Sequence, residues 1–179
     1  MQPVCARIHE LHPGACRRDR FHWRAQADLD PKLAVAYFYR GSAYGAKDDP
    51  DRAIADFNEV IRLDPNHAQA LNGRCYALAI IGQMQQALAD CNESLRLVPN
   101  DASALDSRGF ANLKSGQFDA AIADYDSALK LHPKMATSLY GRGVAKLKKG
   151  DSSGGNSDIA AAKAIQANID DEFARAGVK

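Results

Sequence analysis

Four residues near the N-terminus are of the types that bind zinc. Cys5, His9, His12 and Cys16 bring two thiols and two imidazoles into one short segment, and tetrahedral zinc sites are built from such ligands. A proline–glycine pair at 13–14 interrupts any helix that would stack the four side chains, and their spacing matches no familiar zinc finger. The pattern therefore favours an incidental cluster, and we expect neither a metal nor a cofactor.

The rest of the sequence lacks the usual motifs of catalysis. It contains no phosphate-binding P-loop and no HExxH zinc-protease motif. The glycines Gly154 and Gly155 follow no predicted strand and have no lysine placed to bind phosphate. Serine, histidine and aspartate are present, but in no order that suggests a nucleophile with its base. We expect that the protein is not an enzyme.

The overall composition is that of a folded, nearly neutral protein. Hydrophobic residues make up 46% and charged residues 25% of the 179 residues, and the formal net charge is +1. Nucleic-acid binding needs a clustered cationic surface, so we expect no nucleic-acid partner. No stretch is long and apolar enough to cross a bilayer, and residues 1–20 lack the apolar core of a secretory signal. These features predict no membrane association and a cytoplasmic location.

Most of the chain repeats itself at one constant step, the separation of Pro31 from Pro65. Prolines recur at this step, as do arginines, aspartates and two columns of small residues. The recurring sets are Pro31, Pro65, Pro99 and Pro133; Arg40, Arg74, Arg108 and Arg142; Asp56, Asp90, Asp124 and Asp158; Ala43, Ala77, Ala111 and Ala145; and Ala53, Ala87, Ala121 and Gly155. So many columns with one period identify an internal repeat.

Each repeat is predicted to form two helices. The first helices are expected at 34–46, 68–81, 102–115 and 136–149, and the second at 51–63, 84–97, 118–131 and 152–166. Gly82, Gly116 and Gly150 can adopt the left-handed conformation that ends a helix. In the first unit, Asp49 and Pro50 are a capping residue and a proline suited to a first helical turn. The pattern predicts an all-α protein.

The unit resembles the tetratricopeptide repeat, a helix–turn–helix of about 34 residues with an ordered set of aromatic, small and proline positions. The first unit carries this order in Tyr37, Gly41, Tyr44, Ala53, Phe57, Val60 and Pro65, and the third in Leu105, Gly109, Asn112, Ala121, Tyr125, Ala128 and Pro133. The resemblance covers residues 31–166, as three clear units and a degenerate fourth. It implies a right-handed superhelical solenoid that binds other proteins, without naming a partner.

The four cysteines show neither CxxC spacing nor the density of a disulfide framework. Reduced thiols are the simplest interpretation. Cys75 and Cys91 stand at repeat positions that hold glycine or an aromatic residue in other units. We therefore expect both to be buried, inert thiols.

The N-terminal end of the array departs from the repeat. Residues 20–30 align with the end of a second helix, because Trp23 and Leu29 lie one repeat step before Phe57 and Leu63. They predict a partial preceding repeat. Residues 1–19 fit no register, and we expect this extension to be poorly ordered.

The C-terminal end departs from the repeat as well. Gly154 and Gly155 predict that the fourth second helix frays at its start and is firm only from Asp158. Residues 167–179 are expected to form a short capping helix and tail, with Asn168 as the cap of a helix over 168–177. Such an element would shield the last apolar face of the array from water.

The resemblance also implies a binding site. In this family the first helix of each unit lines a concave groove, and the matching positions here are nearly uncharged and rich in aromatic, amide and hydroxyl groups. They are Val35, Phe38, Tyr39, Ser42, Gln69, Asn72, Tyr76, Ser103, Asp106, Phe110, Thr137, Tyr140 and Val144, with Gly73, Ser107 and Gly141 between them. We expect this groove to bind an extended peptide or a helix of a partner protein. Alternatively, several of the aromatics pack between helices.

Two further interpretations of the array concern charge and assembly. The columns that hold lysines and asparagines in chaperone-tail-binding members contain no cation here in either register, so we do not expect binding of a chaperone carboxylate. The recurring arginine and aspartate columns favour structural pairing, because a residue that contacts a ligand need not recur in every unit. As an alternative function, the chain could self-associate through its ends, with Phe21 and Trp23 at one of them; we expect a monomer or a weak homodimer.

Overall fold

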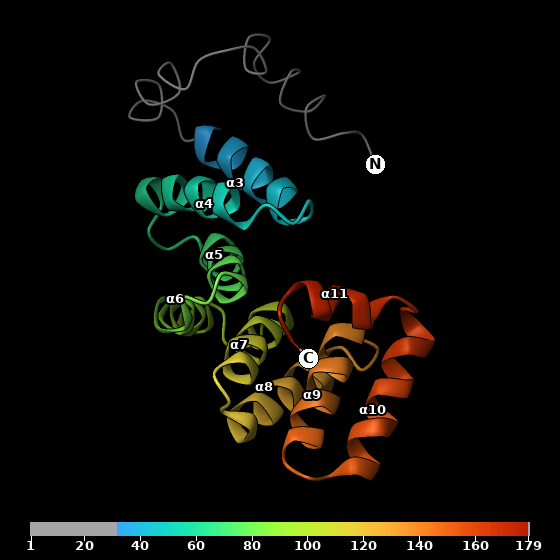
Figure 1. Ribbon diagram of the computed structural model, residues 1–179. Helices are drawn as coiled ribbons and strands as arrows, with labels where there is room; N and C mark the ends of the chain where they lie inside the picture. Colours follow the sequence, from blue (N-terminus) through green and yellow to red (C-terminus); the bar gives the residue numbers. More distant parts are fainter. Residues whose placement is uncertain (1–31, 179) are drawn as a thin grey trace.

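The computed structural model describes residues 32–178, and within that range it contains nine helices and no strands (Figure 1). The helices are α3 (Lys32–Gly45), α4 (Pro50–Leu63), α5 (Ala68–Ile80), α6 (Met84–Leu97), α7 (Ala102–Lys114), α8 (Phe118–Leu131), α9 (Ala136–Lys148), α10 (Ser152–Ile165) and α11 (Ile169–Arg175). Their bounds lie close to most of the predicted ones. The predictions for Cys5, His9, His12, Cys16 and residues 1–30 lie outside the described residues.

Short polar side chains and glycines set the ends of the helices. The carboxylate of Asp101 accepts hydrogen bonds from the amides of Ser103 and Ala104 at the start of α7, and Asp49 caps α4 in the same way. Each such bond satisfies an amide that has no partner within its own helix. Gly82, with φ of 87°, follows the end of α5 in the left-handed region, as the sequence predicted.

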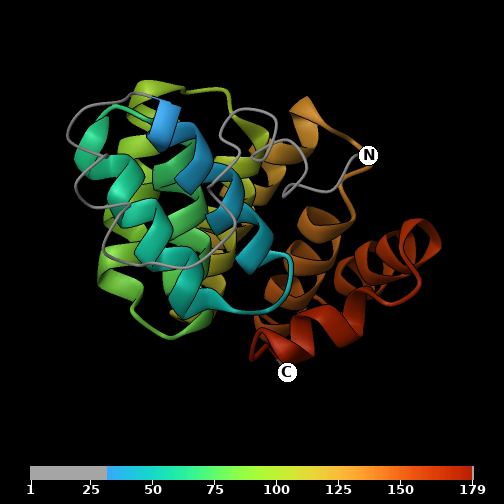
Figure 2. The same cartoon turned by 90° about the horizontal axis from the view of Figure 1, so that it is seen from above.

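The helices pair into four antiparallel hairpins that stack side by side. α3 packs on α4, α5 on α6, α7 on α8 and α9 on α10, and each second helix also packs on the first helix of the next unit. Figure 1 shows the hairpins following one another along the array, and in the view from above α10 and α11 lie to one side of the first hairpins (Figure 2). The first helices α3, α5, α7 and α9 line the inner face of this curved stack (Figure 1). The prediction of an all-α helical-repeat solenoid is confirmed.

Glycines in the first helices allow the aromatic residues of the second helices to reach across two units. A Cβ atom at Gly109 would lie 2.9 Å from the ring of Tyr125, and one at Gly141 in the following unit would lie 2.3 Å from the same ring. Phe57 has the same relation to Gly41 and Gly73. Because both rings are nearly fully buried, each aromatic side chain joins its own hairpin to the next one.

The arginine and aspartate columns form a ladder of ion pairs. Arg108 donates two hydrogen bonds to Asp124 in its own unit, at 2.6 and 3.0 Å, and a third to Asn92 of the preceding unit at 2.9 Å. Arg40, Arg74 and Arg142 bind their own aspartates in the same bidentate way. The carboxylates are largely buried, so the ladder holds helices together. The structural interpretation of these columns is therefore confirmed.

The prediction of reduced thiols at Cys75 and Cys91 was wrong. The two sulfur atoms form a disulfide between α5 and α6, with the Cα atoms 5.5 Å apart, and both residues are fully buried. The cause lies in the repeat itself. Cys75 replaces the glycine and Cys91 replaces the aromatic residue of a pair that is in contact in the first and third units, so the two thiols face each other.

The prediction of a frayed start to the fourth second helix was also wrong. α10 begins at Ser152, because the carboxylate of Asp151 accepts a hydrogen bond from the amide of Gly154. A Cβ atom at Gly155 would lie 2.8 Å from the carbonyl oxygen of Gly143. The glycine therefore serves close packing of α10 on α9, which compensates for its low helix propensity.

Candidate protein-binding groove

The inner face is open over the first unit and covered over the third and fourth. In the first unit, Val35 and Tyr39 of α3 are 47% and 45% exposed. Phe38, between them in sequence, is half-buried and packs against His67, with ring centroids 5.1 Å apart. Phe110 of the third unit and Val144 of the fourth are instead buried. The groove is therefore not uniformly available to a partner.

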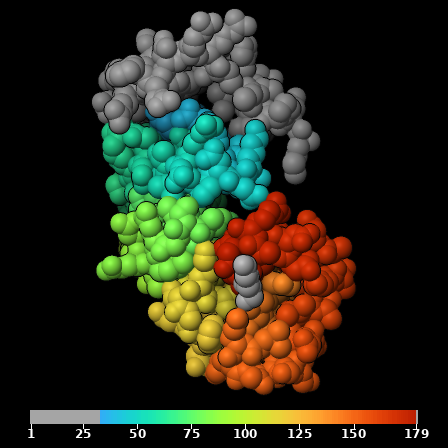
Figure 3. Space-filling view, viewed as in Figure 1, coloured from blue at the N-terminus to red at the C-terminus, as the bar shows by residue number. Residues whose placement is uncertain are grey.

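The cover over the far half is the C-terminal helix α11. The ring of Phe173 lies 4.7 Å from that of Tyr140 and 5.9 Å from that of Phe110, centroid to centroid. Phe110 in turn packs against Tyr76 of α5 at 5.3 Å. The space-filling view shows α11 lying between the surfaces of the second and fourth units (Figure 3). Two of the aromatics predicted to line the groove thus pack against a side chain of α11, and Tyr76 packs against one of those two.

Polar contacts hold the C-terminal end of α11. The ammonium group of Lys114 donates hydrogen bonds to the carbonyl oxygens of Ala176 and Ile80, at 2.8 and 2.9 Å. Burial lowers the pKa of Lys114. The guanidinium of Arg175 binds the carboxylate of Asp48 in the turn of the first unit, at 3.0 Å. α11 is therefore linked to the third and second units and to the turn of the first.

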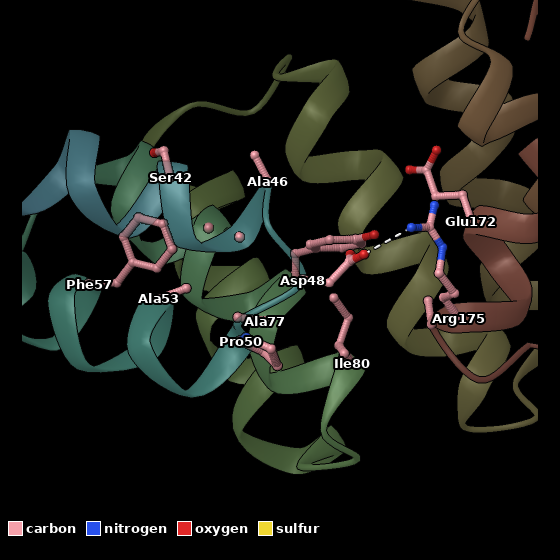
Figure 4. Close-up of a pocket in the computed structure, with 14 residues that line it drawn as sticks. Ser42, Ala46, Asp48, Pro50, Ala53, Phe57, Ala77, Ile80, Glu172 and Arg175 are labelled. Carbon is pink, nitrogen blue, oxygen red and sulfur yellow. Dashed lines mark hydrogen bonds and ion pairs between the residues drawn. The ribbon is translucent and has the colours of Figure 1, made fainter. Parts of the chain in front are cut away.

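A pocket of about 750 Å³ remains between α11 and the first two units. Apolar side chains line most of it, including those of Phe57, Pro50 and Ile80. Figure 4 shows Arg175 and Glu172 on one wall and Asp48 opposite, joined to Arg175 by the ion pair. The pocket is open to solvent and combines an apolar floor with a charged rim. That combination suits an amphipathic segment of another protein.

A second, smaller cavity of about 300 Å³ lies beneath α11. Asp106 lines it and accepts a hydrogen bond of 2.5 Å from the hydroxyl of Ser138. Burial raises the pKa of Asp106 to about 6, although the hydroxyls of Ser138 and Thr137 act to lower it. Burial also raises the pKa of the neighbouring Tyr76 to about 12, with a smaller contribution from the carboxylate of Glu172. Burial thus favours the uncharged form of both side chains.

The predicted groove residues fall into three groups by exposure. Val35, Tyr39, Ser42, Gln69 and Ser103 are exposed, and Phe38, Asn72, Tyr76, Asp106, Thr137 and Tyr140 are half-buried. Phe110 and Val144 belong to the buried cluster that also contains Ile169 and Phe173. The alternative interpretation, that some of the aromatics pack between helices, is therefore correct for Phe110.

Sequence reasoning missed the residues that α11 and the first turn contribute to the inner face. These are Asp48, Pro50, Glu172, Phe173, Arg175 and Ala176. One signal was available: Phe173 lies one repeat step after Leu139 and continues the column of Tyr37, Leu71 and Leu105. It identifies α11 as the shortened first helix of a fifth unit, which would be expected on the inner face. Asn168 stands at its N-cap, as predicted, but its side chain makes no capping hydrogen bond.

Residues 32–178 show neither a membrane-spanning element nor a metal centre. None of their helices combines the length and apolar character needed to cross a bilayer. No group of three or more histidine, cysteine, aspartate or glutamate side chains within this range could hold a metal ion.

Models of known repeat families match the chain over most of the array. The model described as tetratricopeptide repeat matches residues 38–102, and a second one, described as TPR repeat, matches residues 113–150. The hairpins, the constant period of the sequence and these matches agree. The chain belongs to the tetratricopeptide repeat family.

Similar proteins include a receptor and several separate repeat domains. A segment of 52 residues is 44% identical to the human mitochondrial import receptor subunit TOM70, a match that covers 29% of this chain and 9% of the receptor. The structure of MamA is similar with a TM-score of 0.65 and 20% identity, over 83% of this chain and 87% of MamA. The first TPR of Spaghetti (RPAP3), bound to the HSP90 peptide SRMEEVD, is similar with a TM-score of 0.62 and 21% identity, over 68% of this chain and 97% of that domain.

Proposed function

We propose that this chain is a non-catalytic protein-interaction module that binds a segment of a partner protein on the inner face of the repeat array. The observation that carries the proposal is the exposure of Val35 and Tyr39 on α3, the helix whose C-terminal end also lines the open pocket of about 750 Å³. Large apolar side chains that remain exposed beside a concave apolar surface mark an interaction site. A cytoplasmic location remains a prediction.

The charges around the pocket indicate which ligands fit. Asp48, Glu172 and Asp106 place three carboxylates on or near its walls. The two nearby cations are already engaged, Arg175 by Asp48 and Lys114 by two carbonyl oxygens. The related Spaghetti domain binds the acidic peptide SRMEEVD. An acidic tail of that kind is not the ligand we expect here, because the two cations that α11 and α7 place beside the pocket already have partners.

The test compares partner capture by two pairs of substitutions. Val35→Ser with Tyr39→Ser removes the exposed apolar side chains of the groove. Val98→Ser with Leu131→Ser is the matched control, because these residues are 44% and 41% exposed at the ends of second helices, away from the inner face. Affinity capture from lysate, read by mass spectrometry, should lose specific partners with the groove pair alone.

Circular dichroism must first show that both variants keep the helical content of the parent chain. Equal capture by all three proteins would contradict the proposal and place binding elsewhere on the surface.

Self-association through the array ends has less support: α11 packs on α9 and α10 at the C-terminal end, and Ile169 is fully buried there.

A further inference from the structure

The helix α11 lies on the inner face as a bound ligand would. Each first helix of the array contacts helices of the adjacent units. The first helix of a fifth unit would therefore contact the fourth unit alone. α11 contacts α9 and α10 of that unit, but it also reaches Phe110 and Lys114 of the third unit and Asp48 of the first. Its position therefore bridges units that are distant in the sequence.

Three kinds of contact hold α11, and each corresponds to a feature of its sequence. Ile169 and Phe173, four positions apart and thus on one helical face, are 0% and 6% exposed. The carbonyl oxygen of Ala176 at the C-terminal end accepts the hydrogen bond from Lys114, and a cation is favourable at this end of a helix. Arg175, two positions after the aromatic anchor, pairs with Asp48.

We propose that the surface beneath α11 is a binding site for a short helix of a partner protein, and that α11 is its resident, displaceable occupant. The partner helix carries an aliphatic residue, an aromatic residue four positions later and a basic residue two positions after that. This inference rests on the proposed function, since it assigns the ligand of the same inner face.

Several features make α11 easy to displace. It has seven residues, whereas isolated helices shorter than about 12–15 residues are marginal in water. The Arg175–Asp48 pair is 60% and 66% exposed, and exposed pairs of this kind stabilise little. The helix ends at Arg175, which lines the open pocket, and Gly177 follows with φ of 82°. A longer partner helix would continue into that pocket and bury apolar surface that α11 leaves exposed.

The test uses the C-terminal segment itself as the probe. The unlabelled synthetic peptide of residues 166–178 is titrated into the full-length 15N-labelled chain. The released variant carries Ile169→Ser and Phe173→Ser, so that its own helix no longer occupies the site. The matched control carries Asp171→Ser and Ala174→Ser, at two exposed positions of α11.

We expect the peptide to shift the amide signals of Tyr76, Phe110 and Tyr140 in the released variant. The parent chain and the control should bind at least about tenfold more weakly, because a tethered helix competes at an effective concentration in the millimolar range. A peptide with Phe173→Ala should not bind. A folded released variant that shows no binding would overturn the proposal.

Hydrogen exchange on the unmodified chain covers the case in which the released variant does not fold. Amides of α11 should exchange at least about tenfold faster than those of α9, through local opening. Exchange of α11 only together with α9 and α10 would show that it is an integral part of the fold, and would overturn the proposal. So would a dimer in light scattering that forms in the parent and is lost in the released variant, because the site would then belong to a second copy.

The outcomes of the two experiments are separable. Loss of lysate partners with the Val35/Tyr39 pair, together with no peptide binding, would leave the proposed function standing and remove this inference alone.

Discussion

Reduction of the Cys75–Cys91 disulfide should lower the stability of the second unit. The bond joins residues separated by 16 positions, and a crosslink that closes a loop of about 15 residues is worth about 3 kcal/mol through the entropy of the unfolded chain. With an m-value of about 2 kcal/mol/M, typical of urea unfolding, the midpoint should fall by about 1.5 M. The second unit lies inside the array, so its weakening should also separate unfolding of the first unit from that of the last two.

The assay is urea unfolding followed by circular dichroism, with and without dithiothreitol, after peptide mapping has established the bond in the oxidised chain. The variant with Cys75→Ser and Cys91→Ser should show no further response to the reductant, which controls for the two N-terminal cysteines. An unchanged midpoint in the parent, with thiol titration showing full reduction, would refute the reasoning.

A compensating variant tests the explanation from the repeat. The third unit holds Gly109 and Tyr125 at these two positions, and the tyrosine requires glycine in the following unit. Cys75→Gly, Cys91→Tyr and Ser107→Gly together rebuild that arrangement in the second unit. This variant should recover much of the lost stability, because burial of an aromatic ring replaces the crosslink.

The remaining predictions concern the ladder, the glycines and the buried carboxylate. Arg108→Ala should cost about 2–4 kcal/mol in urea unfolding, because it leaves a largely buried carboxylate without its charged partner and with only the hydrogen bond from Asn112. Arg96→Ala, in an exposed pair, should leave the midpoint unchanged. Gly141→Ala should cost about 1–2 kcal/mol, since overpacking against the tyrosine ring beneath it outweighs the gain in helix propensity, and Gly45→Ala, with no atom within 4 Å of the added Cβ, should not destabilise. The pKa of Asp106 is about 6 in the folded state against an ordinary value of 3.8. Between these two pH values the folded state therefore binds more protons at this residue than the unfolded state does. Stability of the parent relative to Asp106→Asn should therefore fall by about 1–3 kcal/mol as the pH rises from 4 to 7, measured by unfolding at both pH values.

The sequence predicted the helices and the ladder because both recur in every unit. Each copy of the repeat supports the others, so an arginine found four times with an aspartate at the same separation indicates one packing arrangement. The disulfide was missed for a related reason: cysteine spacing was judged along the chain alone. The glycine and aromatic columns at Cys75 and Cys91 already indicated that these positions are in contact in the fold.

The path of α11 could not be predicted in the same way. Its caps and apolar spacing predicted a helix over 168–177, close to the observed Ile169–Arg175. Its position depends on the packing of Phe173 against Tyr140 and Phe110, and on the hydrogen bond from Lys114 to the carbonyl oxygen of Ala176. The repeat column of Phe173 indicates a first helix on the inner face, but it does not indicate these contacts, which join α11 to a distant unit.

The same distinction separates the residues that build the array from those that give this chain its own binding properties. Positions that recur in all units, such as the arginine column, have the same structural role in each unit and therefore do not indicate a ligand. Asp106 stands in a column otherwise occupied by Phe38, Asn72 and Tyr140, and Lys114 is likewise placed where the first two units have alanine and isoleucine. Asp106 lines the cavity beneath α11, and Lys114 binds the end of that helix. Because both depart from the repeat at the surface where α11 docks, their substitution should change what the inner face binds more than it changes the architecture of the array.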